Sequence, residues 1–172
     1  MSLDLKNYIR DIPDFPQKGI LFRDITPLLG SPEAFRAALD LLVARYRDAK
    51  LQKVAGIESR GFLFAAPLAL ELGIGMVPIR KKGKLPSVCL SETYDLEYGS
   101  AVIEVHEDAV EAGDRVLLLD DLLATGGTLA AACRLVEKLN AEVVEVCTLI
   151  ELTGLNGRAM LGERPFHSFL QY

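Results

Sequence analysis

The chain has 172 residues, half of them hydrophobic and a quarter charged, a composition typical of one globular domain with a substantial core. Its net charge of −5 argues against a nucleic-acid-binding surface, and no uncharged run reaches the roughly 18 residues of a membrane-spanning helix. Three cysteines and two histidines without metal-ligand spacing do not favour a zinc site. The first residues lack the apolar run of a signal peptide, so we expect a cytoplasmic protein that does not insert into membranes.

The apolar side chains of the first thirty residues do not follow a single helical or strand period. A short helix is predicted over residues 2–10. Residues 11–30 hold three prolines among many apolar side chains, which predicts an irregular segment that packs over another part of the protein. Ser31 is a suitable helix cap, and the spacing of apolar residues after it predicts a helix to about Lys50.

From Val54 onward, short apolar strands alternate with helical patterns. The predicted strands are 54–57, 76–79, 100–106, 116–119, 141–152 and 166–170, and the predicted helices are 62–72, which Pro67 should kink or restart, 129–139 and part of 154–161. This alternation indicates an α/β fold with a central, mostly parallel sheet and helices on both faces. The loops 58–61, 80–84 and 120–128 should then gather at the carboxyl ends of the strands, where open α/β sheets bind ligands.

Residues 115–129, RVLLLDDLLATGGTL, form the most informative stretch. Four buried aliphatic residues predict a strand that ends at the acidic pair Asp120 and Asp121. The following loop consists of Ala124, Thr125, Gly126, Gly127 and Thr128. It leads into a helix, whose free N–H groups and positive dipole end bind anions. A carboxylate ahead of such a loop can accept hydrogen bonds from sugar hydroxyls or hold hydrated Mg²⁺, so the stretch suits a sugar phosphate.

Cationic residues stand in the other two loops. Arg60 follows the strand 54–57, and its planar guanidinium suits two phosphate oxygens. The run RKKGK at 80–84 places four cations after another strand of an otherwise acidic chain, which indicates a polyanion site. Either feature alone would be read as an ordinary solvated surface.

Residues 85–99 are rich in proline, serine, threonine and tyrosine and are predicted to form a long loop or a hairpin with a long tip. Such a segment can act as a mobile lid that excludes water from a reactive intermediate. An ordinary exposed hairpin tip explains the same composition, and the sequence does not separate the two interpretations.

VLLLDDLLATGGTL resembles the phosphoribosyl pyrophosphate (PRPP) motif of type I phosphoribosyltransferases. GILFRDITPLL, GIESRGFLF, IRKKGKLP and LEYG extend the resemblance over nearly the whole chain to the adenine phosphoribosyltransferase family. The resemblance implies one domain over 1–172 with an N-terminal hood at 1–30 and a flexible lid at 85–99. It also implies a homodimer that transfers the phosphoribosyl group of PRPP to adenine, with Mg²⁺, and forms AMP and pyrophosphate.

The resemblance also implies roles for individual residues. The implied catalytic residues are Arg60, Glu97, Asp120 and Asp121. The implied pyrophosphate ligands are Glu58, Ser59, Arg60, Arg80, Lys81 and Lys84, with a cis peptide expected between Glu58 and Ser59. The implied 5′-phosphate ligands are Ala124 to Thr128, and the implied adenine ligands are Leu21, Phe22, Arg23 and Leu152. Mg²⁺ would be bound through PRPP and water near Asp120 and Asp121.

Three alternatives remain at this stage. An enzyme for hypoxanthine, guanine or xanthine would keep the phosphate loop and change the base pocket. A regulatory protein could bind PRPP as an effector, although the chain has neither the length nor the charge of a DNA-binding regulator. A catalytically inactive interaction protein is disfavoured by the intact set of phosphate-binding and acidic residues.

Overall fold

The computed structural model describes residues 3–95 and 99–172. Within these residues the chain forms two compact units, Met1–Arg45 and Tyr46–Tyr172, which we call the N-terminal unit and the C-terminal unit. The single domain over 1–172 and the hood at 1–30 stay predictions. No helix among the described residues is long and apolar enough to cross a membrane.

The N-terminal unit is a small hairpin followed by helices. Its elements are the 3-10 helix η1 (Leu5–Tyr8), strands β1 (Arg10–Pro13) and β2 (Leu21–Asp24), and helices α1 (Thr26–Gly30) and α2 (Pro32–Tyr46). The Ser31 hydroxyl accepts a hydrogen bond from the Ala34 N–H at 3.3 Å, which confirms the cap predicted for α2.

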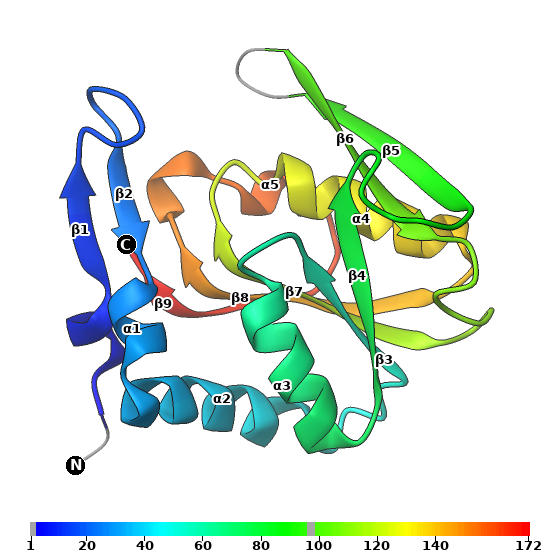
Figure 1. Cartoon of the computed structure of the whole chain (residues 1–172), viewed down its shortest axis with the longest axis horizontal. Coiled ribbons are helices and arrows are strands. Elements are labelled where there is room, and N and C mark those ends of the chain that lie inside the picture. Colours follow the sequence, from blue (N-terminus) through cyan, green and yellow to red (C-terminus); the bar gives the residue numbers. More distant parts are fainter. Residues whose placement is uncertain (1–2, 96–98) are drawn as a thin grey trace. The chain divides into compact units, whose positions relative to one another are not determined.

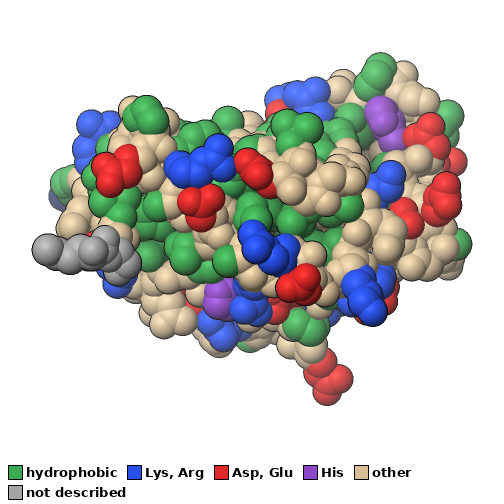
Figure 2. Space-filling view, turned by 90° about the horizontal axis from the view of Figure 1, so that it is seen from below, with side chains coloured by type: hydrophobic (Ala, Val, Ile, Leu, Met, Phe, Trp, Pro, Cys, Tyr) green, Lys and Arg blue, Asp and Glu red, His purple; other side chains and the backbone are tan. Residues whose placement is uncertain are grey.

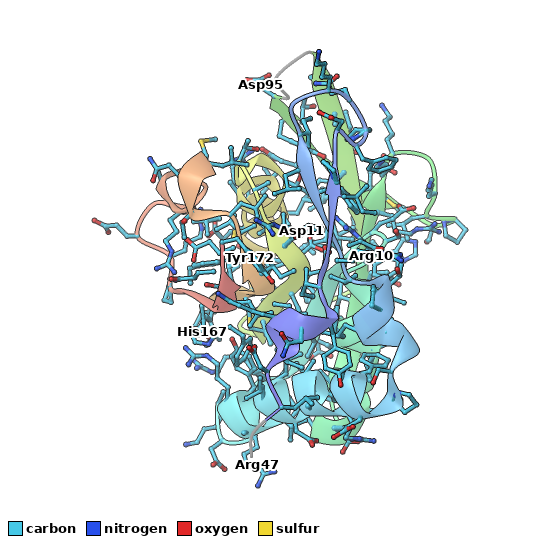
Figure 3. The ribbon with its side chains drawn as sticks, turned by 90° about the vertical axis from the view of Figure 1, so that its left-hand side faces the viewer. Arg10, Asp11, Arg47, Asp95, His167 and Tyr172 are labelled. Atoms are coloured by element: carbon cyan, nitrogen blue, oxygen red, sulfur yellow. The ribbon has the colours of Figure 1, made fainter. Side chains whose placement is uncertain are left out.

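The prediction of an irregular segment over residues 11–30 was wrong. β1 and β2 pair as antiparallel strands, with Ile12 opposite Phe22. Asp14 and Gly19 have positive φ angles in the connection, and the Gly19 N–H donates to the Asp14 carboxylate at 2.7 Å. Arg10 projects from β1 beside Asp11 and forms an ion pair with Asp24 at 2.6 Å (Figure 3). Four-residue strands are too short for alternation to reveal them in the sequence.

The C-terminal unit contains, in its described residues, one seven-stranded sheet with the order β5-β6-β4-β3-β7-β8-β9 (Figure 1). The strands are β3 (Lys53–Ile57), β4 (Gly75–Lys81), β5 (Cys89–Asp95), β6 (Ser100–His106), β7 (Arg115–Leu123), β8 (Glu142–Glu151) and β9 (Phe166–Gln171). β4, β3, β7, β8 and β9 are parallel, and β6 and β5 continue the sheet as antiparallel strands. The predicted α/β class with a mostly parallel sheet is confirmed.

Helices α3 (Phe62–Leu72) and α4 (Gly127–Lys138) cover opposite faces of this sheet (Figure 1). The side chains of β3 alternate between the two faces of the sheet, and each face is covered by one of these helices. Ala55 and Ile57 join the core beneath α4, whereas a Cβ on Gly56 would lie only 2.7 Å from Ala65 of α3. α3 continues through Pro67 without restarting. The 3-10 helix η2 (Thr153–Leu155) and the short helix α5 (Arg158–Leu161) follow β8.

Two boundaries differ from their predictions. β7 does not end at the acidic pair but continues to Leu123, because its pairing with β8 extends to Leu123 opposite Glu151. Within the segment 85–99, the seven residues Cys89–Asp95 form strand β5, which pairs with β6 along its whole length as a hairpin. Asp95 lies at the outer end of that hairpin (Figure 3), and residues 96–98 lie outside the described residues.

Candidate active site

The carboxyl ends of β3, β4 and β7 lie side by side, as predicted, because β3 pairs in parallel with both neighbours. The segments that follow or complete these strands are 58–61, 80–84 and 120–128. Contacts between their side chains join them: Glu58 contacts Lys84, and Arg60 contacts Asp121. The three segments therefore form one candidate site at this edge of the sheet.

The loop between β7 and α4 encloses a cavity of about 90 Å³. The residues that line it are Asp120, Leu122, Leu123, Ala124, Thr125, Gly126, Gly127, Thr128 and Leu129. Gly126 caps α4 with a φ of +88°, a left-handed conformation that glycine adopts without strain. The first turn of α4 carries no acidic side chain, so its N–H groups and dipole present positive potential to the cavity. The loop therefore has the backbone geometry and positive potential that suit an anion such as a phosphate group.

The side chains of the two adjacent acids of β7 lie in different surroundings, because successive residues of a strand point to opposite faces of the sheet. Asp120 lines the phosphate cavity. Asp121 is 2 % exposed and has its Oδ2 atom 3.1 Å from Arg60 Nε. This contact is ionic without being a hydrogen bond, since Oδ2 has no hydrogen-bond partner. Asp120 lies on the cavity wall, Asp121 lies against Arg60, and the roles expected of both acids at the ribose stay predictions.

Burial governs the electrostatics of this pair. Removal from water raises the pKa of Asp120 well above its usual value, and the neighbouring Asp121 carboxylate adds to the rise. Burial also raises the pKa of Asp121, and the Arg60 guanidinium partly offsets that rise. Asp121 is buried and Asp120 half-buried, and Arg60 offsets only part of the cost of ionising this adjacent pair, which is a common feature of ligand sites.

The segment after β3 places Arg60 at the edge of the site. The peptide between Glu58 and Ser59 is cis, as predicted. A Cβ on Gly61 would lie 2.6 Å from the Ile57 oxygen and 2.8 Å from the Leu119 oxygen, so only glycine allows the chain to turn this tightly between β3 and β7. Gly61 follows Arg60 and caps α3, which begins at Phe62, so the turn fixes the backbone position from which the Arg60 side chain extends.

Glu58 is a carboxylate surrounded by donors from the basic segment Arg80–Lys84. It accepts hydrogen bonds from Lys84 Nζ at 2.7 Å, the Lys81 N–H at 3.0 Å and two Arg80 nitrogens at 3.3 Å. Burial by itself would raise the pKa of Glu58, but these donors outweigh it and lower the pKa to about 2. Glu58 therefore contacts cations that were expected to bind pyrophosphate.

A second buried carboxylate, which the sequence did not single out, holds the same basic segment. Glu104 on β6 is 8 % exposed and accepts hydrogen bonds from the Gly83 N–H at 2.9 Å and the Ser91 hydroxyl at 3.0 Å. It stands opposite Arg80 in the β4–β6 ladder. The alternation of β6 indicated a strand, but only the antiparallel pairing with β4 shows that Glu104 reaches the turn of the basic segment.

The expected adenine ligands belong to different parts of the chain. Leu21, Phe22 and Arg23 lie on β2 of the N-terminal unit. The Phe22 ring packs edge-on against the Phe15 ring, with 5.1 Å between the ring centroids, and Arg23 forms an ion pair with Asp11. Leu152 follows β8 in the C-terminal unit, and its N–H donates to the Leu123 oxygen at 2.9 Å. Glu97 lies outside the described residues. The roles of all five at the base stay predictions.

No group of three His, Cys, Asp or Glu side chains in the described ranges could hold a metal ion. The expectation that Mg²⁺ is bound through PRPP and water near Asp120 and Asp121 stays a prediction, and Asp120 is the acid that lines the cavity.

Comparisons with known proteins point to one family. A family model described as a phosphoribosyl transferase domain matches residues 25–160. The adenine phosphoribosyltransferase of Roseiflexus castenholzii is 56% identical over 172 residues, covering 100% of each chain. That of Mus musculus is 55% identical over 167 residues, 95% of this chain and 93% of the relative.

Solved structures give the same result. Adenine phosphoribosyltransferase from Thermoanaerobacter pseudethanolicus superposes with a TM-score of 0.95 at 49% identity, covering 98% of each chain. The Saccharomyces cerevisiae enzyme was solved with adenine and an imino-altritol bisphosphate. It superposes with a TM-score of 0.92 at 43% identity, covering 96% of each chain. This chain belongs to the adenine phosphoribosyltransferase family.

Proposed function

We propose that the site at the carboxyl ends of β3, β4 and β7 binds PRPP and transfers its phosphoribosyl group to adenine, forming AMP and pyrophosphate. The observation that carries this proposal is the convergence of a phosphate-sized cavity, an acidic pair and two cationic segments at one sheet edge. Membership of the adenine phosphoribosyltransferase family identifies the base.

The 5′-phosphate of PRPP binds in the cavity formed by Ala124, Thr125, Gly126, Gly127 and Thr128. Backbone N–H groups at the start of α4 donate to its oxygens, and the two threonines add hydroxyl donors. Asp120 on the cavity wall accepts hydrogen bonds from the ribose hydroxyls. Fixing the phosphate and the ribose at two points orients C1 of the sugar toward the incoming base.

The pyrophosphate group faces Ser59, Arg60 and the basic segment. During transfer, the bond from ribose C1 to the pyrophosphate oxygen breaks and a bond from C1 to the adenine nitrogen forms on the opposite face of the sugar. Negative charge grows on the pyrophosphate as it leaves, and preorganised cations such as Arg60, Arg80 and Lys81 stabilise that charge. The proton lost by adenine passes to a base, which we propose is Glu97.

Mg²⁺ is proposed to bind near Asp120 and Asp121 through PRPP oxygens and water. Asp120 suits this role, since it is a carboxylate on the cavity wall and hard cations prefer oxygen ligands. Asp121 suits it less, since it is buried against Arg60. When bound, Mg²⁺ would neutralise part of the charge on the leaving pyrophosphate.

Adenine is proposed to contact Leu21, Phe22, Arg23 and Leu152, as the resemblance to the family implies. Phe22 and Leu152 offer an aromatic and an aliphatic face for a planar, apolar base. The backbone of Leu21 would read the edge of the base, and Arg23 would lie beside it.

A homodimer is proposed on the basis of helix α3. Its residues Leu63, Ala66, Pro67 and Leu70 recur at helical spacing on one face, and Leu63 is 42% and Leu70 83% exposed. Figure 2 shows a face of the molecule where hydrophobic side chains reach the surface between charged ones. Such a stripe is suited to bury itself against the same stripe of a second copy. The cytoplasm remains the expected compartment.

A substrate panel tests the proposal. The protein is incubated with PRPP and Mg²⁺ and with adenine, hypoxanthine, guanine or xanthine, and nucleotide formation is followed for each base. We expect AMP from adenine and little product from the oxopurines. Product from an oxopurine instead would retain the PRPP site and reject the proposed base. No product from any base, with PRPP still binding, would favour an effector-binding protein.

A further inference from the structure

The backbone of the phosphate loop lies directly against the turn that begins α5. A Cβ on Gly126 would approach the Gly157 oxygen to 2.4 Å, and a Cβ on Gly157 would approach the Ala124 oxygen to 2.2 Å. Gly157 would also meet the Leu123 side chain at 3.0 Å. Both glycines are therefore required for the two backbones to pack without a side chain between them. A shift of Gly157 toward the loop would push on the backbone of Ala124 and Gly126.

The residue after Gly157 ties this turn to the sheet. Arg158 donates to Glu151 through Nε at 2.6 Å and Nη2 at 2.7 Å, a bidentate pair whose geometry fixes the arginine in direction as well as distance. The Arg158 guanidinium also lies 4.8 Å from the centre of the Phe166 ring. Arg158 is thus held by β8 and by β9.

Glu151 is a rigid anchor. It is 4 % exposed and also accepts hydrogen bonds from Ser168 at 2.8 Å and Gln171 at 3.3 Å, so both of its oxygens are satisfied. It stands opposite Leu123, the last residue of β7 before the phosphate loop. The hydrogen bond from Arg158 is the main cause that lowers the pKa of Glu151, which keeps the carboxylate charged at neutral pH.

We propose that Arg158 is a positioning residue for the 5′-phosphate of the substrate. It holds Gly157 against Ala124 and Gly126, and so preorganises the N–H groups of the loop without touching the ligand. This inference rests on the proposed function, because it takes the loop cavity as the 5′-phosphate site. Binding that depends on a preformed loop weakens when the loop gains freedom, since the ligand must then order it.

The test uses Arg158→Gln and Arg158→Lys, with Arg164→Gln as the matched control. Arg164 also forms a bidentate pair, with Glu137 at 2.6 and 2.8 Å, but it joins the end of α4 to the segment after α5. Ribose 5-phosphate binding is measured by calorimetry, KM is measured for PRPP and for adenine, and thermal melts show that each variant is folded.

We expect Arg158→Gln to weaken ribose 5-phosphate binding and raise the KM for PRPP by about tenfold or more, with the KM for adenine unchanged. Arg158→Lys keeps the charge and loses the bidentate geometry. Its ribose 5-phosphate affinity and its KM for PRPP should lie between those of the wild type and those of Arg158→Gln. Gly157→Ala, which pushes on the loop directly, should give the same pattern, and Arg164→Gln should bind like the wild type.

Ribose 5-phosphate affinity within twofold of the wild type in folded Arg158→Gln would overturn the inference. An equal rise in both KM values would also overturn it, because that pattern indicates a general structural role. A wild-type protein that binds no ribose 5-phosphate would reject the assignment of the loop itself, and with it the proposed function, so the two failures are distinguishable.

Discussion

Arg60 and Asp121 form an ion pair across the carboxyl ends of β3 and β7, with 3.1 Å between Nε and Oδ2. The arginine is thereby oriented before any ligand arrives, while its side chain remains 38% exposed at the site. Under the proposed function, the second acid of the motif acts through Arg60 and the first acid faces the sugar. This division of roles between Asp120 and Asp121 is the basis for two predictions.

Arg60→Ala should lower kcat/KM for PRPP by about a hundredfold or more, the size of effect seen when a preorganised charge is removed from a transition state. The KM for adenine should change little. The variant should also lose up to about 3 kcal/mol of unfolding free energy, because Asp121 remains buried without its counter-charge. Steady-state kinetics and denaturant unfolding measure the two effects.

Arg115→Ala is the control for Arg60→Ala. Arg115 has the same 38% side-chain exposure and pairs with Glu142 at 2.9 Å, but it lies at the amino end of β7, away from the site. It should keep wild-type kinetics. Wild-type turnover and PRPP affinity in Arg60→Ala would remove Arg60 from the active site.

Asp120→Asn should make the unliganded protein more stable and much less active. Burial and the Asp121 charge raise the pKa of Asp120, so its ionised form opposes folding at neutral pH. The penalty is complete above the raised pKa of the folded state, shrinks as the pH falls below it, and is absent only below the usual aspartate pKa near 3.8. Removing the charge should therefore raise the melting temperature most at neutral and higher pH. A gain of about 1 kcal/mol corresponds to roughly 2–4 °C for a chain of this size.

Asp121→Asn is the paired comparison for Asp120→Asn. It should give less stabilisation or none, because Arg60 compensates the Asp121 charge and would lose its partner. Its use of Mg²⁺-PRPP should weaken through a displaced Arg60. Equal melting temperatures for Asp120→Asn and the wild type across roughly pH 5 to 8, the range in which folded proteins tend to be most stable, would show that the charge at Asp120 is not destabilising.

Glu58→Gln should loosen the basic segment, because Lys84, Arg80 and the Lys81 N–H would lose a common charged acceptor. We expect a several-fold higher KM for PRPP and, in the reverse reaction, for pyrophosphate, with adenine binding unchanged. Glu137→Gln, which removes another carboxylate bound bidentately by an arginine, is the control and should leave both KM values unchanged.

The stability effect of Glu58→Gln should depend on pH. A carboxyl whose pKa is lowered in the folded state stabilises the fold above its usual pKa near 4.5, and this contribution is lost as the pH falls toward about 2. The melting temperature of the variant should be below that of the wild type at pH 7 and approach it by pH 3. A difference that stays constant over this range would mean that packing, not charge, accounts for the loss.

Leu70→Glu should convert the proposed dimer into monomers. Leu70 is 83% exposed on the apolar stripe of α3, and a charge buried in an interface without a partner strongly disfavours association. Sedimentation velocity at micromolar concentration measures the change. Val88→Glu, at a residue 67% exposed before β5, is the control and should not alter the oligomer. If the basic segment reaches across the interface, PRPP use should fall together with the dimer.

The sequence by itself determined the class of fold, the positions of most C-terminal strands along the chain and the loops that carry the candidate site. These follow from local signals, because buried parallel strands require continuous apolar runs and a phosphate loop requires glycine before a helix. The cis peptide after Glu58 and the cluster of three loops were expected from the family resemblance and from the rule for open sheets.

Only the tertiary structure decided which side chains meet. Asp120 and Asp121 look equivalent in the sequence, and their separate roles follow from the extension of β7 through both residues, which turns one toward the cavity and the other toward Arg60. The partners of Glu58, Glu104 and Glu151 lie between 7 and 26 residues away along the chain. Contacts at such separations depend on strand pairing and register, which no local pattern of residues contains.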